Sequence, residues 1–103
     1  MKGVDKTILY LNWSRVIYAE SLGNHSLIHT LDQEFETTES LKTLEKRYEK
    51  MFLKCHESYM VNPAHVHSIR RFKMTVTGGR ELPIPEKKYT ALKKALQEVI
   101  AAR

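Results

Sequence analysis

Short runs of β-branched and aromatic residues recur along this chain, and an apolar stripe with helical spacing occurs in only two places. The clearest run begins at His25, where apolar and polar residues alternate with a period of two. Such alternation places successive side chains on opposite faces of a strand, so the chain is expected to build a sheet rather than a helical bundle. The alternating residues are His25, Leu27, His29 and Leu31 on one face and Ser26, Ile28 and Thr30 on the other.

Turn-forming residues divide the rest of the chain into further short strands. Gly78-Gly79 favours a two-residue hairpin, because glycine adopts positive φ at little cost. Asn62 is expected to cap one helical turn begun by Pro63, after a loop that holds Ser58-Tyr59 and Val61-Asn62. The predicted strands are two within residues 7–20, separated by a turn at 12–14, one around Phe35, and residues 52–54, 66–72, 74–77 and 80–84.

Two segments have helical spacing. The first helix is predicted over about residues 38–51, with Thr37 or Thr38 as its N-cap. The second is predicted over about residues 86–101, opened by Pro85-Glu86. The apolar positions of the two stripes are Leu41, Leu44, Tyr48 and Met51 in the first, and Tyr89, Leu92, Leu96 and Val99 or Ile100 in the second.

The order of these elements predicts the fold class. Strands and helices do not alternate as they do in a parallel βαβ sheet, so a mainly antiparallel β domain with two helices is expected. The 103 residues are enough for one domain, residues 1–103, without a dividing linker. No run approaches the ~18 apolar residues that would span a membrane, and no secretory signal is evident. With one cysteine, the chain is expected to work in the reducing cytoplasm.

The charge of the chain is unevenly distributed. Residues 51–103 carry ten basic and four acidic side chains, whereas residues 1–50 carry seven and eight. This imbalance favours a polyanionic partner such as nucleic acid, although a basic surface that only confers solubility remains an alternative. The densest basic cluster is Arg70-Arg71-Phe72-Lys73, for which the alternative is solvated charge with Phe72 in the core. The acidic segment 32–36 is interpreted as a solvated face.

The stretch 54–63 combines a thiol, an imidazole, a carboxylate and a hydroxyl in four consecutive positions, Cys55 to Ser58. Adjacent residues on a strand point to opposite faces, so Cys55 and His56 are not expected to form a catalytic pair. Alternation turns Cys55 inward, where a free cysteine acts as a small apolar residue. Neither enzyme activity nor a cofactor is therefore expected.

Metal binding is also not expected. His65 and His67 would project to one side of an extended segment, but the five histidines are scattered and lack the spacing of a zinc site. The histidines are His25, His29, His56, His65 and His67.

Three segments, taken in order, resemble the LytTR domain, the DNA-binding effector domain of many bacterial two-component response regulators. The first is residues 16–25, VIYAESLGNH, and the third runs from Gly79 to Ile84 and is followed by a helix. The second is the most specific, Phe52-x-x-Cys55-His56-x-Ser58-Tyr59-x-Val61-Asn62. Leu41 and Leu44 lie between them in the predicted helix, and the resemblance extends from about Ile8 to Leu96.

The resemblance implies sequence-specific binding of duplex promoter DNA by loops in successive major grooves, with two copies on repeated half-sites. The base-reading loops would hold Asn24-His25, Glu57 and the segment after Ile84, and a receiver domain would accompany the domain in the full-length protein. On this basis residues 1–6 are expected to be the end of a linker or the start of a stand-alone form. The residues predicted to contact DNA are Asn24, His25, Glu57, Ser58, Arg70, Arg71, Glu86, Lys87 and Lys88.

Two positions depart from the family pattern. Glu57 stands where the family often has Arg, Lys or Asn, and a carboxylate can only accept hydrogen bonds and repels phosphate. Pro85-Glu86 replace a common Ser-Arg, which leaves Lys87 or Lys88 to make the contacts there. These departures motivate an alternative function, a protein-interaction or ligand-sensing β module that has lost its DNA contacts.

Overall fold

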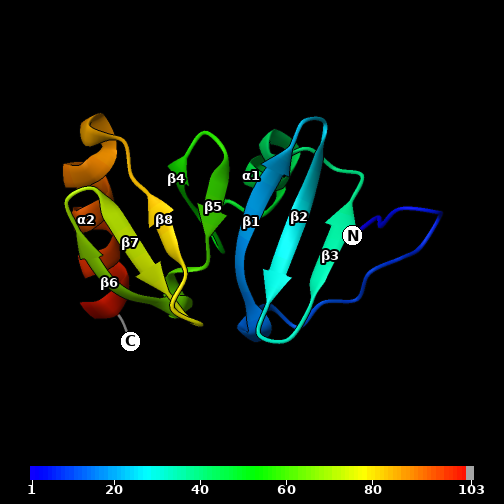
Figure 1. Ribbon diagram of the computed structural model, residues 1–103, viewed down its shortest axis with the longest axis horizontal. Coiled ribbons are helices and arrows are strands. Elements are labelled where there is room, and N and C mark those ends of the chain that lie inside the picture. The colour runs from blue at the N-terminus through cyan, green and yellow to red at the C-terminus, as the bar shows by residue number, and fades with distance from the viewer. Residues whose placement is uncertain (102–103) are drawn as a thin grey trace.

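The computed structural model describes residues 1–101 and contains two antiparallel sheets and two α-helices, as the sequence predicts (Figure 1). The five-stranded sheet contains, in spatial order, β3 (Glu34–Thr37), β2 (His25–Thr30), β1 (Val16–Leu22), β5 (Tyr59–Val61) and β4 (Leu53–His56). The three-stranded sheet contains β6 (Val66–Arg70), β7 (Lys73–Val76) and β8 (Glu81–Pro83). The helices are α1 (Leu41–Arg47) and α2 (Glu86–Ala101), and two short 3-10 turns are η1 (Trp13–Arg15) and η2 (Pro63–His65).

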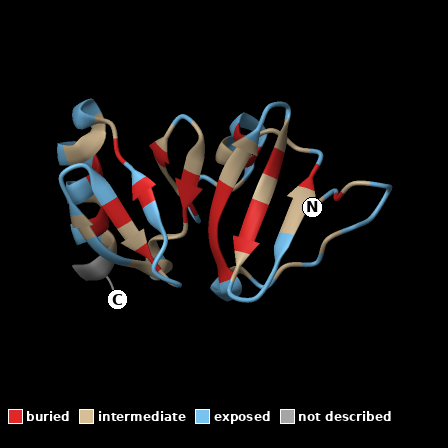
Figure 2. Cartoon of the chain, viewed as in Figure 1, coloured by how far each residue is buried: buried red, intermediate tan, exposed pale blue. Residues whose placement is uncertain are grey.

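Residues 16–19 of the central strand β1 are buried (Figure 2). A bulge distributes their side chains between two cores. The pairing register with β2 shifts between Val16 and Tyr18. Because of this bulge, Ile17 and Tyr18 both face the core shared with β6–β8 and α2, while Val16 and Ala19 face the core covered by α1. Both faces of the five-stranded sheet are thus used for packing.

Helix α1 is shorter than predicted, because local contacts end it on both sides. Its N-cap is Ser40, whose hydroxyl accepts a hydrogen bond from the Thr43 N–H at 3.2 Å. Thr37 belongs to β3 instead, and its hydroxyl donates to the Lys2 carbonyl at 2.6 Å. At the other end Tyr48 leaves the helical conformation and packs its ring 4.6 Å from that of Trp13. The prediction of a helix over 38–51 with Thr37 or Thr38 as N-cap is therefore wrong at both ends, and Met51 is 45% exposed.

Two strand predictions are also wrong. The loop expected around Tyr59 is strand β5, which pairs with both β1 and β4 and so lies inside the sheet. The first strand expected within residues 7–20 does not form, since Ile8 makes only an isolated bridge to Lys2 and Tyr10 is 90% exposed. That segment has a β-type composition, but none of the described strands pairs with it.

Other predicted features are confirmed, with boundaries shifted by one or two residues. Asn62 caps η2 by accepting the Ala64 N–H at 3.0 Å. Gly78 and Gly79 lie between β7 and β8 with φ of 91° and 81°, but the connection is longer than the predicted two residues, since β7 ends at Val76 and β8 begins at Glu81. Helix α2 covers the range predicted for the terminal helix. Whether residues 1–6 act as a linker stays a prediction; in this structure Gly3 pairs with Thr37 at the end of β3.

Candidate nucleic-acid interface

Strand directions bring the predicted DNA-contacting turns to one edge of the molecule. Strands β1 and β4 both run antiparallel to β5, so the turns that follow them open at the same edge of the sheet. Strands β6 and β8 both run antiparallel to β7, so the β6–β7 turn and the segment leading into α2 share an edge of the second sheet. Figure 1 shows the β1–β2 turn, the β4–β5 turn and the start of α2 along the top of the molecule. We call the surface formed by these three segments and the β6–β7 turn the loop edge.

The β4–β5 turn is held by hydrogen bonds that involve its own residues and β1. The Ser58 N–H donates to Nδ1 of His56 at 3.0 Å, and the Ser21 N–H donates to the Ser58 carbonyl at 2.8 Å. Because Nδ1 accepts, the proton of the neutral His56 ring is on Nε2. Ser58 therefore contributes its backbone to the turn, and Glu57 is left exposed at the tip.

The β1–β2 turn presents Asn24 and His25. Gly23 has a φ of 64°, which allows the tight reversal, and Asn24 beside it is exposed. His25 begins β2, and its Nδ1 lies 2.8 Å from Oε2 of Glu36 on β3. The two side chains are 43% and 40% exposed, so the pair lies at the surface.

The β6–β7 turn carries the predicted arginines. Arg70 and Arg71 are both exposed, and Arg70 is paired with Glu81 of β8, with 3.0 Å between Nη2 and Oε2. Phe72 is 38% exposed and lies edge-on to Tyr89 of α2, with ring centroids 5.7 Å apart, so the alternative that placed it in the core is wrong. The Ile84 N–H donates to the Phe72 carbonyl at 2.9 Å and ties this turn to the segment before α2.

The start of α2 completes the loop edge. Glu86 and Lys87 are exposed, and Lys88 is half-buried near Cys55 of β4. A carboxylate in the first turn stabilises a helix through its dipole, which gives Glu86 a structural role. The loop edge thus carries charges of both signs, with Arg71, Lys87 and Lys88 against Glu57 and Glu86.

Cys55 is a core residue, as its alternation predicts. Its side chain is fully buried, and its Sγ donates to the Tyr59 carbonyl at 3.7 Å. Burial raises the pKa of the Cys55 thiol to about 11, so the nucleophilic thiolate is scarce at neutral pH.

The rings of His65 and His67 both contact the hydroxyl of Thr77. Nδ1 of His65 and Nε2 of His67 lie 2.8 and 3.1 Å from Oγ1 of Thr77, and Nε2 of His65 lies 2.6 Å from the Ser14 carbonyl. These contacts join η2, β6, the connection between β7 and β8, and η1. Within residues 1–101 no group of three or more His, Cys, Asp or Glu is placed to hold a metal ion.

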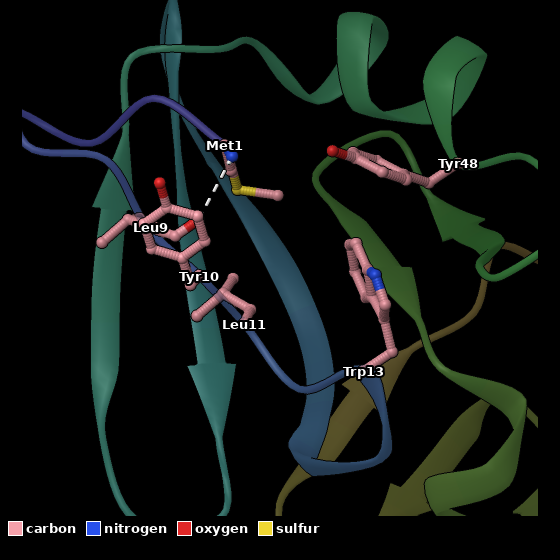
Figure 3. Close-up of a pocket in the computed structure, with 6 residues that line it drawn as sticks. All are labelled: Met1, Leu9, Tyr10, Leu11, Trp13 and Tyr48. Carbon is pink, nitrogen blue, oxygen red and sulfur yellow. Dashed lines mark hydrogen bonds between the residues drawn. The ribbon is translucent and has the colours of Figure 1, made fainter.

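A cleft of about 240 Å³ opens between the N-terminal segment and α1, away from the loop edge (Figure 3). Its lining is mainly apolar and aromatic and carries no carboxylate, imidazole or thiol. No helix among the described residues is long and apolar enough to cross a membrane. The residues that line the cleft are Met1, Leu9, Tyr10, Leu11, Trp13 and Tyr48.

The sequence reasoning missed Glu36 as a partner of His25. Glu34 and Glu36 flank Phe35, so alternation places both carboxylates on one face of β3. That signal was available, but residues 32–36 were interpreted only as a solvated face. The pairing itself depends on the register between β2 and β3, which places Glu36 opposite Leu27, two residues from His25 on the same face.

Fold and loop edge together define a mainly antiparallel β domain whose charged turns lie along one edge. Residues 6–97 match the family model of the LytTr DNA-binding domain, and the chain belongs to this family. A solved LytTr DNA-binding domain of a response regulator from Bacillus cereus superposes with a TM-score of 0.73. That match covers 94% of this chain and 93% of the solved chain at 21% identity, so it supports the fold.

Two named relatives are transcriptional regulators. The chain is 31% identical over 101 residues to the CO-responsive transcriptional regulator RcoM of Rhodospirillum rubrum, covering 91% of this chain. It is 30% identical over 70 residues to the transcriptional regulatory protein LytR of Staphylococcus aureus, covering 67% of this chain. The matches span 43% and 28% of the lengths of these relatives, respectively.

Proposed function

We propose that this domain binds duplex DNA sequence-specifically through the loop edge and acts as the output domain of a transcriptional regulator. The observation that carries the proposal is the alignment of the β1–β2 turn, the β4–β5 turn and the start of α2 along one edge of a LytTr-family domain. A two-stranded β-ribbon fits the major groove of B-DNA, which is roughly 12 Å wide. The β1–β2 hairpin and the β4–β5 hairpin are both two-stranded ribbons.

The long axis of the domain is comparable with one helical turn of DNA. The axis measures 39 Å, and in Figure 1 the three loops occupy part of it, since the N-terminal segment extends beyond β3. One helical turn of B-DNA is about 34–36 Å. In this proposal the β1–β2 turn and the start of α2 address neighbouring major grooves on one side of the duplex, with the β4–β5 turn between them.

Each predicted residue has a role in this proposal. Asn24, His25 and Glu57 would face base edges, and Glu57 would accept from an amino group such as cytosine N4. Arg71, Lys87 and Lys88 would contact phosphates, with Arg70 contributing less because Glu81 already pairs with it. The Ser58 backbone and the Glu86 carboxylate would mainly fix the turn and the helix start.

In the whole protein, two copies would occupy repeated half-sites in a promoter, and a receiver domain would control them in a two-component system. The matched relatives support this proposal, since they are regulators of which the matched segment is a minor part. The pairing has a direct test, because binding to a duplex with two half-sites should be steeper than binding to a single half-site.

The central test is a binding titration by fluorescence anisotropy. The duplex that the wild-type domain enriches from a randomised library is compared with a scrambled duplex at fixed salt, and a preference above about tenfold is expected, which is ~1.4 kcal/mol. Equal affinity for both duplexes would remove the proposed function.

A matched pair of lysine variants tests the location of the interface. Lys87→Ala should weaken binding to both duplexes and reduce the salt slope by about one. Lys50→Ala removes another exposed charge near η1 and η2, away from the loop edge, and should leave both quantities unchanged. Equal effects of the two variants would place the DNA elsewhere.

A further inference from the structure

His25 and Glu36 form a surface pair at the loop edge. His25 is the first residue of β2, and Glu36 is the third residue of β3. Nδ1 of His25 lies 2.8 Å from Oε2 of Glu36, a charge-assisted hydrogen-bond distance. Among the described residues, Glu36 is the acidic group in ion-pair contact with this ring.

A second histidine on the same face shows what a structural pair looks like here. His29 is held by Glu20 at 2.8 Å and by Glu34 at 3.3 Å, and its side chain is only 10% exposed. Its ring is also stacked on that of Tyr18, with centroids 4.0 Å apart. Both of its ring nitrogens face carboxylates, so neither is directed to solvent.

The His25 ring differs, because one nitrogen is held and the other has no recorded partner within the described residues. An ionised carboxylate can only accept a hydrogen bond, so Nδ1 of His25 must carry the proton. In the neutral ring Nε2 is then an acceptor, and in the charged ring it is a donor. The Glu36 contact thus fixes both the tautomer and the direction of Nε2.

We infer that Glu36 is a positioning residue for base recognition, which sets the tautomer of His25 and directs its Nε2 toward the major groove. This inference rests on the proposed function of the loop edge. The neutral ring would accept from the amino group of adenine or cytosine, and the charged ring would donate to N7 or O6 of guanine. Other charged groups on this face, Glu20 and Glu34, are engaged with His29.

The affinity test uses the fact that a positioning role and simple repulsion predict opposite signs. Removing a negative charge near DNA raises affinity for every duplex if the carboxylate only repels phosphate. Glu36→Ala should instead lower affinity for the library-selected duplex by about tenfold, the loss expected for one good base contact, while affinity for the scrambled duplex stays equal or rises. Equal gains on both duplexes would overturn the inference.

The matched control is Glu34→Ala, which removes the same charge from the same face of the same strand. It leaves the His25 pair intact, so it should not lower the preference for the selected duplex. Melting curves of both variants establish that they are folded at the assay temperature. A loss of preference in Glu34→Ala equal to that in Glu36→Ala would overturn the specific role of Glu36.

The tautomer itself can be observed by ¹⁵N NMR of the histidine rings at pH 8, above the usual histidine range near 6.5. The wild-type His25 should show a protonated Nδ1, and Glu36→Ala should show a shift of the proton to Nε2. Glu36→Gln keeps an acceptor oxygen and should retain part of the wild-type signal and preference. An unchanged His25 spectrum in Glu36→Ala would refute the inference.

The two proposals fail in different ways. If the wild-type domain shows no preference for any duplex, the proposed function fails, whatever the NMR result. If the wild-type domain is specific and the loss in Glu36→Ala persists in a His25→Ala background, Glu36 acts independently of His25 and only the inference fails.

Discussion

The β1–β2 turn and the β4–β5 turn lie at the same edge and each has a histidine beside it, yet the two histidines are used differently. Nδ1 of His56 accepts the Ser58 N–H within its own turn, whereas Nδ1 of His25 faces the carboxylate of Glu36 on another strand. The first ring completes a turn, and the second is held by a carboxylate of the neighbouring strand, with its side chain 43% exposed. The residue type alone therefore does not identify a DNA contact; the partner of each ring nitrogen does.

The largest expected effect comes from a change beneath both turns. Leu44 of α1 is fully buried in the core that also contains Ala19 of β1 and Met60 of β5. Leu44→Ala should lower the free energy of unfolding by about 2–5 kcal/mol, because it removes buried methyl groups and leaves a cavity. Urea denaturation measures this loss.

Because Leu44 supports both strands, its replacement should affect the two turns alike. Amide hydrogen exchange in the β1–β2 and β4–β5 ladders should accelerate together in Leu44→Ala. A wild-type-like unfolding curve would mean that α1 does not pack against the sheet as described.

A smaller loss is expected from the β4–β5 turn alone. His56→Ala leaves the Ser58 N–H without its acceptor, which should cost about 1–2 kcal/mol of stability. Thermal or urea unfolding measures the loss, and exchange of the Ser58 amide should increase while exchange in the β1–β2 ladder does not. Unchanged stability would show that His56 does not maintain the turn, and the distinction between the two histidines would disappear.

These contrasts show which parts of the molecule could be predicted from the sequence. The alternation from His25 and the glycines at 78 and 79 act locally, so β2 and the β7–β8 hairpin were predicted correctly. Strand β5 was missed because three residues carry little local signal and its pairing with β1 and β4 depends on distant segments. The end of α1 depends on the contact between Tyr48 and Trp13, which are far apart in the chain.

The candidate site divides in the same way. The resemblance to a known family assigned a role to the β1–β2 and β4–β5 turns, although the local pattern around Tyr59 predicted a loop where β5 forms. The partners that distinguish His25 from His56 could not be predicted, because Glu36 reaches His25 only through the register of β2 with β3. The partner of each histidine ring therefore depends on contacts between strands, which composition and spacing do not predict.

Glu57 at the tip of the β4–β5 turn offers the next test of the comparison. Glu57→Arg replaces an acceptor with a fork of donors and should raise DNA affinity by about tenfold at low salt, ~1.4 kcal/mol. Anisotropy titrations measure this gain. The matched control is Glu49→Arg, since Glu49 is exposed in the connection between α1 and β4, away from the loop edge.

The control decides between two functions of this turn. If Glu49→Arg raises affinity as much as Glu57→Arg, the gain is nonspecific attraction and the turn does not approach the duplex. That outcome would favour the alternative of a protein-interaction or ligand-sensing module that has lost its DNA contacts.

His25→Ala is expected to have the smallest effect on stability and a large effect on DNA recognition. The pair of His25 with Glu36 is well exposed, and exposed ion pairs contribute at most about 1 kcal/mol, so His25→Ala should change the free energy of unfolding by less than about 0.5 kcal/mol. The same variant should lose preference for the library-selected duplex, because it removes Nε2 from the groove. Urea denaturation and paired anisotropy titrations measure the two quantities on one sample. If His25→Ala is destabilised as strongly as His56→Ala and keeps its DNA preference, the roles of the two histidines are the reverse of those described, and the β1–β2 turn only maintains the fold.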